Sequence, residues 1–252
     1  MGGGRRVNIL ITGASVGLGR GMAREFAAAG HSLALCARRV DALQALRDEL
    51  LAAAPGIRVS VRALDVNCHE DVFSVFRDFA AEFGTLDRIV VNAGVGKGQP
   101  LGTGYFHANL ATAQTNFVAA LAQCEAAMEL FRAQGSGHLV TISSMSALRG
   151  MPRNMTAYGA TKAGLASLSE GLRLELLGTP IRVTTVYPGY IRTEINDFAG
   201  KLPFEVDEAT GSRAIVRAIE SGRDEVYVPA WPWRWIGMLM RVAPLWLLRR
   251  MI

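Results

Sequence analysis

Hydrophobic and polar positions follow two alternating spacings along almost the whole chain. Short runs rich in Val, Ile and Leu indicate strands buried on both faces, and longer segments between them place apolar residues at helical spacing. One helical stripe of this kind is formed by Leu43, Leu46, Leu50 and Leu51. The predicted strands are Val7–Thr12, Ser32–Ala37, Arg58–Ala63, Leu86–Asn92, His138–Ser143, Ile181–Tyr187 and Glu225–Val228. This alternation predicts an α/β, doubly wound three-layer fold, in which helices cover both faces of a mainly parallel sheet of about seven strands.

The alternation runs through residues 1–228, and we expect them to form one domain. A chain of 252 residues, half of them apolar, is long enough to build such a core, and no internal repeat or Pro/Gly/Ser-rich linker divides it. Residues 229–252 form a tail rich in Trp, Leu, Met and Arg. Its uncharged stretches, Trp235–Met240 and Val242–Leu248, are far shorter than the ~20 residues that span a bilayer. Three roles remain open for this tail: a lid that closes over a pocket, a contact between subunits, or a peripheral segment on a membrane surface.

Composition and charge exclude several other classes of protein. The net charge is +5, but Lys and Arg are dispersed and form no basic stripe with interleaved aromatic residues, so we expect no nucleic-acid partner. The three cysteines are too few and too scattered for a disulfide framework, and no apolar signal-peptide core follows Met1, which predicts a cytoplasmic location. The four histidines lie far apart and pair with no Cys, Asp or Glu at a metal-ligand spacing, so we expect no metal.

A glycine-rich turn directly follows the first predicted strand. The segment Thr12-Gly13-Ala14-Ser15-Val16-Gly17-Leu18-Gly19 leads from that strand into a helix that should begin near Leu18. Glycines let the backbone turn sharply and approach a pyrophosphate, whose negative charge is favoured at a helix N-terminus. Such a turn alone also suits an ordinary tight connection. Its position between a strand and a helix favours dinucleotide binding in a Rossmann-type fold.

Four further motifs stand at the ends of later strands. They are Asp65-Val66, Asn92-Ala93-Gly94, Ser143-Ser144 with Tyr158-x-x-x-Lys162 beyond it, and Pro188-Gly189. Together with the TGxxxGxG turn, and in this order, they make residues 7–228 resemble the short-chain dehydrogenase/reductase family. The resemblance implies a nicotinamide cofactor bound by Gly13, Ser15, Gly17, Leu18, Gly19, Arg38, Arg39, Asp65, Val66, Asn92, Ala93, Gly94, Tyr158, Lys162, Pro188, Gly189, Ile191 and Thr193.

The residues at the end of the second predicted strand indicate which nicotinamide cofactor is bound. An acidic residue at this position usually holds the free ribose of NAD(H), whereas Arg accommodates the 2′-phosphate of NADP(H). Arg38 and Arg39 stand here, and guanidinium groups can hold a phosphate with paired hydrogen bonds. We therefore expect NADP(H). The alternative is that both arginines are solvated and Asp41 contacts the ribose, although Asp41 also suits a cap of the following helix.

The spacing of Tyr158 and Lys162 predicts that both side chains reach one region. Residues four apart share a helix face, and a nearby cation stabilises a phenolate and lowers the tyrosine pKa from ~10. Tyr158 can then exchange a proton with a substrate oxygen at neutral pH. The resemblance implies that Ser144 hydrogen-bonds the same oxygen, and that Asn116 holds a water linking Lys162 to solvent.

One departure from the family pattern leaves the catalytic serine open. The interval from Ser144 to Tyr158 is one residue longer than in the family's commonest form, so Ser143 and Ser146 are alternatives. Strand alternation points Ser143 and Ser144 to opposite faces, and only one of them can face the substrate.

The loops after the fourth to sixth strands should form the substrate pocket. Their apolar residues are Met145, Leu148, Met151, Met155, Tyr190, Ile195, Phe198 and Phe204, which favour an apolar ketone, aldehyde or alcohol but also suit simple packing on the sheet. We expect a carbonyl reductase or alcohol dehydrogenase that forms a homodimer or homotetramer through helices around His107–Phe131 and Thr156–Leu177. The alternative function is a non-catalytic NADP(H)-binding sensor or scaffold protein.

Overall fold

A computed structural model describes residues 6–96, 98–194, 200 and 202–251. In this part of the chain, seven parallel strands form one sheet in the order β3-β2-β1-β4-β5-β6-β7. The strands are β1 (Asn8–Thr12), β2 (Ser32–Ala37), β3 (Val59–Ala63), β4 (Arg88–Val91), β5 (Gly137–Ile142), β6 (Ile181–Pro188) and β7 (Glu225–Val228). All seven predicted strands are therefore confirmed, with ends that differ by at most two residues.

The helices alternate with these strands. They are α1 (Gly17–Ala28), α2 (Val40–Ala53), α3 (His69–Phe83), α4 (Phe106–Ala113), α5 (Ala119–Gln134), α6 (Met155–Glu175), α7 (Glu208–Glu220), α8 (Ala230–Val242) and α9 (Leu245–Met251). Two short helical segments complete the series: η1 (Gln114–Val118), a π-helical turn, and η2 (Met145–Ala147), a 3₁₀ turn.

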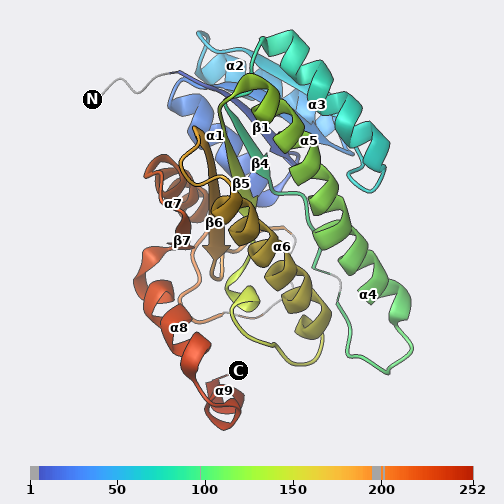
Figure 1. The fold of residues 1–252 in the computed structure, drawn as a ribbon, viewed down its shortest axis with the longest axis vertical. Helices are drawn as coiled ribbons and strands as arrows, with labels where there is room; N and C mark the ends of the chain where they lie inside the picture. Colours follow the sequence, from blue (N-terminus) through green and yellow to red (C-terminus); the bar gives the residue numbers. More distant parts are fainter. Residues whose placement is uncertain (1–5, 97, 195–199, 201, 252) are drawn as a thin grey trace.

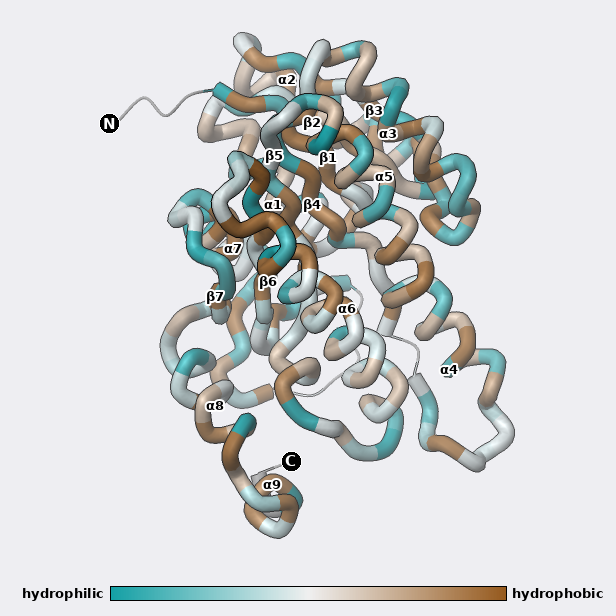
Figure 2. The backbone as a smooth tube through the Cα atoms, viewed as in Figure 1, coloured by the Kyte–Doolittle hydropathy of each residue, from teal (hydrophilic) through white to brown (hydrophobic). Residues whose placement is uncertain are grey.

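Helices cover the sheet on both faces, which confirms the doubly wound three-layer fold (Figure 1). Alternate side chains of each strand point to opposite faces, so Ile9 and Ile11 pack with α1, α2 and α7 while Leu10 packs with α3, α5 and α6. Figure 2 shows hydrophobic residues concentrated along the central strands. Two separate apolar cores result, one on each face of the sheet.

The predicted helix around His107–Phe131 differs from expectation because a π-helical turn, η1, separates α4 from α5. A π turn accommodates one residue more than an α-helical turn and is found mostly at functional sites. Asn116 lies in this turn, and its side chain is buried. The apolar pattern on either side is helical, so the interruption could not be predicted from the pattern of apolar positions.

The tail folds into α8 and α9, and α8 packs against η2, β6 and β7. A third hydrophobic cluster joins them; its buried members are Met145, Tyr187, Trp233, Met240, Ala243 and Leu248. No helix in the described part of the chain is long and apolar enough to span a membrane.

A buried polar network holds the amino-terminal side of the central strands. The guanidinium of Arg88 on β4 donates to Nδ1 of His138 on β5 at 3.1 Å and forms an ion pair with Glu220. Nε2 of His138 lies 2.8 Å from the hydroxyl of Thr184 on β6. Burial, and then the charges of Arg88 and Arg182, lower the pKa of His138 to about 3. His138 is therefore neutral in the folded protein, and it has a structural role within a strand.

This network predicts a loss of stability in mild acid. The unfolded chain protonates His138 near pH 6.5 and the folded protein only near pH 3, so the unfolded state binds more protons between these values. The free energy of unfolding should fall by about 1.5 kcal/mol from His138 alone as the pH is lowered from ~6.5 to ~5. Urea unfolding of the parent and of His138→Gln at both pH values measures this difference. The exposed His69→Gln is the control, and an unchanged pH dependence in His138→Gln would contradict the assignment.

Candidate active site

The residues predicted to form the site lie at the carboxyl ends of β1 to β6. The strand order reverses between β1 and β4, because β2 and β3 extend the sheet on one side of β1 and β4 to β7 extend it on the other. In open parallel sheets, the connections at such a point diverge and leave a crevice beyond the strand ends. The carboxyl ends of the strands point toward the lower part of the molecule in Figure 1, where α4 and α8 lie.

The turn after β1 has space for backbone atoms but not for side chains at its glycine positions. Gly13 and Gly17 have φ values of +64° and +53°, which favour glycine. A Cβ atom on Gly19 would lie 2.4 Å from the carbonyl oxygen of Gly13, and one on Gly13 would lie 2.9 Å from Cα of Ala93. The residue that precedes α1, Val16, offers no side-chain hydrogen bond to the first N–H groups of the helix. These features fit a pyrophosphate, which can occupy the bare helix end and accept those hydrogen bonds.

Thr12 joins the ends of β1 and β4. Its hydroxyl accepts hydrogen bonds from the backbone N–H groups of Asn92 at 3.0 Å and Ala93 at 3.1 Å, and the Asn92 side chain donates to the Thr12 carbonyl at 2.9 Å. Sequence reasoning included Thr12 in the motif but gave it no role. A buried hydroxyl directly before a glycine turn was the available signal, because such a group must find partners.

Beyond the glycine turn, the end of β2 carries the two arginines of the cofactor prediction. The side chains of Arg38 and Arg39 are exposed, and neither side chain makes a hydrogen bond or ion pair with another described residue. The backbone N–H of Ala14 donates to the carbonyl of Cys36 at 3.2 Å, so the turn and the end of β2 are directly connected. The interpretation of Asp41 as a helix cap is wrong: Arg39 occupies the N-cap position of α2, and Asp41 lies in the first helical turn.

The end of β3 contributes Asp65 and Val66. Val66 is buried, and a carboxylate oxygen of Asp65 accepts a hydrogen bond from the backbone N–H of Asn67 at 3.0 Å. The side chain of Asn67 in turn accepts from Thr115 of the π turn at 3.3 Å. Asp65 and Val66 therefore border the same crevice as the π turn that carries Asn116.

Ser144, Tyr158 and Lys162 come together between β5 and α6. The Ser144 hydroxyl lies near enough to the Tyr158 hydroxyl to lower the pKa of the phenol, and the Lys162 ammonium lies 6.0 Å from the centre of the Tyr158 ring. Lys162 is buried, and its ammonium donates to the carbonyl of Ile142 at the end of β5 at 2.9 Å. The phenol and the ammonium thus approach each other as the four-residue spacing predicted.

The three serines near this point have different partners. The hydroxyl of Ser143 donates to the backbone carbonyl of Lys162 at 2.9 Å, and the hydroxyl of Ser146 donates to that of Ser144 at 2.9 Å. Only Ser144 contacts the Tyr158 hydroxyl. Ser143 therefore fastens β5 to α6, and Ser146 orients Ser144.

Asn116 lies on the other side of the lysine. Its carbonyl oxygen accepts from the N–H of Val95 at 2.8 Å and its amide donates to the Val95 carbonyl at 2.8 Å. A Cβ atom on Gly94 would lie 3.1 Å from this Asn116 oxygen and 3.5 Å from the Lys162 nitrogen. Gly94 therefore leaves a narrow space between Asn116 and Lys162, and Asn116 holds the loop that forms it. The amide keeps one further donor and one further lone pair for a water.

Burial shifts the pKa values of Tyr158 and Lys162 in opposite directions. It raises the pKa of the Tyr158 phenol, an effect that the hydrogen bond from Ser144 partly offsets. It lowers the pKa of Lys162 from 10.5 to about 8. In the protein alone, the stable pair at neutral pH is therefore a neutral phenol beside an ammonium that is costly to keep charged.

The predicted substrate-pocket residues divide into two groups. Met145, Leu148, Met151 and Tyr190 pack in the third hydrophobic cluster with α8, whereas Met155 and Phe204 are exposed. Ile195 and Phe198 lie outside the described residues. Part of the predicted lining therefore serves to attach the tail.

Trp233 of α8 reaches the Pro188-Gly189 motif, which sequence reasoning did not foresee. A Cβ atom on Gly189 would lie 2.1 Å from the indole ring, so only glycine allows this contact. Tyr190 and Phe204 meet the same ring edge-on, with centroids 5.1 and 6.4 Å away. The tail thereby supports the segment from β6 to Thr193, whose side chain lies 3.4 Å from the Cβ position of Gly17.

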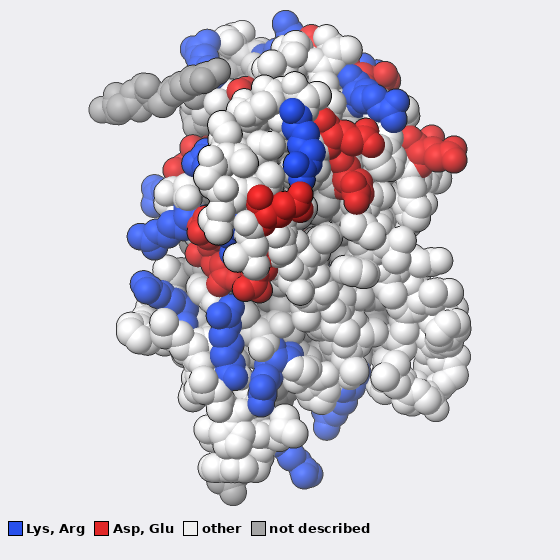
Figure 3. Space-filling view, viewed as in Figure 1, with Lys and Arg blue, Asp and Glu red and all other residues white. Residues whose placement is uncertain are grey.

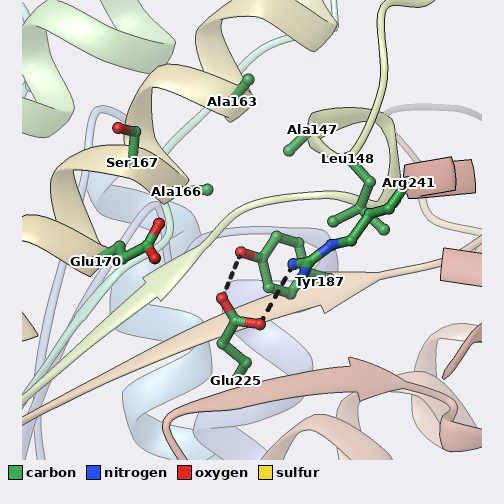
Figure 4. Close-up of a pocket in the computed structure, with 9 residues that line it drawn as sticks. All are labelled: Ala147, Leu148, Ala163, Ala166, Ser167, Glu170, Tyr187, Glu225 and Arg241. Atoms are coloured by element: carbon green, nitrogen blue, oxygen red, sulfur yellow. Dashed lines mark hydrogen bonds and ion pairs between the residues drawn. The ribbon is translucent and has the colours of Figure 1, made fainter. Parts of the chain in front are cut away.

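Apart from the crevice at the strand ends, a cavity of about 250 Å³ lies between α6, β6, β7 and α8 (Figure 4). Its polar side is a chain of contacts: the Tyr187 hydroxyl donates to Glu225 at 3.2 Å, and Arg241 of α8 donates to the other Glu225 oxygen at 3.3 Å. Ser144, Tyr158 and Lys162 do not line it. The carboxylate of Glu225 connects α8 to β6 and β7 and so fixes the outer wall of the domain.

The chain matches known proteins over nearly its whole length. A family model described as short chain dehydrogenase covers residues 7–201. The Mycobacterium tuberculosis protein named uncharacterized oxidoreductase Rv0945 is 51% identical over 245 residues, which cover 97% of each chain. The Arabidopsis thaliana protein named 11-beta-hydroxysteroid dehydrogenase 1A is 33% identical over 242 residues, covering 88% of this chain and 68% of that one. A short-chain type dehydrogenase/reductase structure from Mycobacterium marinum has a TM-score of 0.80 at 26% identity, covering 94% of this chain and 96% of that one.

Because Lys162 is buried, we predict that its charge lowers the free energy of unfolding of the protein. Keeping the Lys162 ammonium charged at neutral pH is costly, because burial lowers its pKa to about 8. Lys162→Met should therefore raise the free energy of unfolding at neutral pH by roughly 2 kcal/mol, the charging cost less the lost bond to Ile142. Denaturant unfolding measures the change, and the exposed Arg77→Met serves as control. A clear destabilisation by Lys162→Met would show that the bond outweighs the cost of burial.

Proposed function

This chain belongs to the short-chain dehydrogenase/reductase family, and we propose that it is an NADP(H)-dependent oxidoreductase that interconverts an apolar carbonyl compound and its alcohol. The observation that carries the proposal is the contact between the Tyr158 and Ser144 hydroxyls beside the buried Lys162, at the edge of the sheet that also bears the glycine turn. Proton donors in that position serve a carbonyl oxygen that gains negative charge.

The cofactor, when bound, supplies the hydride for reduction or accepts it in oxidation. Gly13, Gly17 and Gly19 give its pyrophosphate a backbone-lined turn at the start of α1. Exposed Arg38 and Arg39 offer paired donors for a 2′-phosphate. Thr193, beside Gly17, and Ile191 complete the wall from the side of β6.

The protein's own groups handle the proton and the developing charge. In reduction, Tyr158 donates its phenolic proton to the substrate oxygen, and Ser144 donates a hydrogen bond to the same oxygen. Ser146 holds Ser144 in place, since its hydroxyl donates to the Ser144 oxygen. In oxidation, the phenolate removes the alcohol proton.

Lys162 and Asn116 support the phenol. The ammonium stabilises the phenolate that remains after proton transfer, and its bond to the Ile142 carbonyl keeps it aimed at the crevice. Asn116, with one donor and one lone pair still available, holds a water through which the proton is replaced from solvent. Ser143 is assigned a structural role.

An apolar, ring-shaped alcohol or ketone is the substrate class that we favour. Met145, Leu148, Met151 and Tyr190 supply apolar surface next to Ser144, and the Arabidopsis relative is named for a hydroxysteroid. A non-catalytic NADP(H)-binding protein remains the alternative function, which the turnover screen below distinguishes.

Assembly and location follow from surface and cysteine chemistry. α4 to α6 and the turn after α6 expose Leu110, Leu121, Leu174 and Leu177, and we infer that copies of the chain pair through these helices as a homodimer or homotetramer. All three cysteines are free thiols, which suits the reducing cytoplasm.

Turnover of a panel of ketones, aldehydes and alcohols, followed by NADPH absorbance, tests the function. Tyr158→Phe removes the proton donor but keeps the ring, so activity on any substrate should fall by about 10³-fold. NADPH binding, measured by fluorescence titration, should stay within a few-fold of the parent. The control Tyr105→Phe, an exposed tyrosine outside the crevice, should retain activity. NADPH binding without turnover of any panel member would favour the non-catalytic alternative, and full activity of Tyr158→Phe would overturn the mechanism.

The choice of cofactor has its own test. Arg38→Asp should weaken NADPH binding by at least ~10-fold, because it loses a charge-assisted pair and adds a repulsion, and should leave NADH binding unchanged or improved. Titrations of the parent and of Arg38→Asp with both nucleotides measure this. Arg47→Asp, on the exposed side of α2, is the charge-matched control. Tighter binding of NADH than of NADPH by the parent would refute the assignment.

A further inference from the structure

We propose that the outer face of α8 and α9, together with the neighbouring loop ends, docks on the surface of an anionic lipid bilayer. The exposed apolar residues of this tail face are Trp231, Trp235, Met238, Leu239, Val242, Leu245 and Trp246. The proposal goes beyond the oxidoreductase activity and does not depend on it.

The first argument is that α8 is apolar on both of its sides. Its inner side carries Trp233, Ile236 and Met240 into the third hydrophobic cluster, as any packed helix would. Its outer side should then be polar, yet Trp235 is 61% exposed and Val242 79% exposed. The apolar run continues in α9, where Leu245 and Trp246 are 74% and 63% exposed, and Figure 2 shows hydrophobic residues along both helices. Exposed apolar surface of this extent usually marks a partner.

The second argument is the sign of the charge around this face. The sequence contains no Asp or Glu in residues 226–252, nor in residues 130–169, which include η2 and the start of α6. Arg153, Arg234 and Arg249 are exposed and make no ion pair with a described residue. Figure 3 shows the result on one side of the molecule: Asp and Glu lie over the upper half, and the lower part carries only Lys and Arg. Such a surface is complementary to anionic headgroups.

A third argument is that further apolar side chains lie at the same end. The loop before α4 exposes Leu101 and Tyr105 by 67 and 52%, and the first residue of α4, Phe106, is 74% exposed. α4 and α9 both lie toward the lower end of the molecule in Figure 1, on either side of the start of α6. A flat partner can contact both groups of residues.

The tail is fixed to the domain, so the face is preformed. Arg149, in the loop after η2, donates to the Ala243 carbonyl at the junction of α8 and α9 at 3.2 Å. Arg241 is paired with Glu225 on β7. Trp233 packs on Gly189. A preformed face pays little ordering cost when it binds.

A bilayer fits this surface better than a second copy of the chain does. Trp side chains favour the boundary between headgroups and acyl chains, and Arg reaches the headgroup phosphates from there. Two copies paired through the same face would bring Arg234 and Arg249 together with no carboxylate from residues 226–252 to offset them. No part of the proposal requires a membrane-spanning helix.

Vesicle flotation tests the proposal with the full-length chain. The parent should float with vesicles of phosphatidylcholine and phosphatidylglycerol in equal parts, bind vesicles of phosphatidylcholine alone at least ~10-fold more weakly, and be released by salt. The double variant Trp235→Ser/Val242→Ser and the charge reversal Arg234→Glu/Arg249→Glu should each lose binding by at least ~10-fold.

Matched controls and a second readout separate the outcomes. Leu174→Ser/Leu177→Ser removes equally exposed apolar side chains at the far end of α6, within the inferred subunit contact, and Arg77→Glu reverses an exposed charge on α3; both should still float, even where the first changes the oligomeric state. Light scattering reports whether the tail variants change the oligomeric state, and thermal unfolding and NADPH binding report whether they remain folded. Absence of vesicle binding by the parent would overturn the proposal. So would equal losses in the controls, or an oligomer that dissociates only in the tail variants without any lipid binding.

Discussion

Backbone approaches backbone at the carboxyl edge of this sheet more closely than any side chain would permit, and the site depends on that approach. The carbonyl of Gly13 fills the position where a Cβ atom of Gly19 would be, and Gly13 itself lies against Ala93 of the next strand end. The buried hydroxyl of Thr12 and the amide of Asn92 satisfy the polar groups that this crowding removes from water. Glycine also leaves room for side chains of other elements at Gly94, between Asn116 and Lys162, and at Gly189, under Trp233. A crevice with backbone walls is thereby kept open for a ligand.

The charged group at the centre of the site, the Lys162 ammonium, is buried in surroundings that favour uncharged groups. Lys162 is buried at the end of β5, where its ammonium donates a hydrogen bond to a neutral carbonyl, that of Ile142. Desolvation costs are tolerated in such places because the charge is useful to a reaction. The two apolar cores on either face of the sheet, and the Arg88–His138 network at its other end, supply stability far from the chemistry. Function and stability are therefore separated along the strand direction.

Structural features that depend on neighbouring residues in the chain were predicted from the sequence, whereas features that depend on contacts between distant residues were not. Seven strands followed from short apolar runs, and the approach of Tyr158 to Lys162 followed from helical spacing, because both patterns are set by neighbours in the chain. The capping role of Asp41 was wrong because the chain enters α2 at Arg39, two residues earlier. Trp233 was recognised as part of an unusual tail, but its contact with Gly189 joins residues more than forty positions apart and leaves no local pattern. The choice among three serines likewise required the structure, since it depends on where α6 lies.

The π turn between α4 and α5 has a consequence for how this protein can vary. Each residue advances an α-helix by ~100°, so the extra residue rotates the face of α4 relative to α5 by about that angle. α5 contacts α3 in the core, whereas α4 contacts α6 at the substrate end. The face that α4 turns toward α6 is therefore set independently of the face that α5 turns toward α3. Substitutions in α4 can reshape the approach to the crevice while α5 keeps its packing, which allows substrate range to diverge without repacking the core.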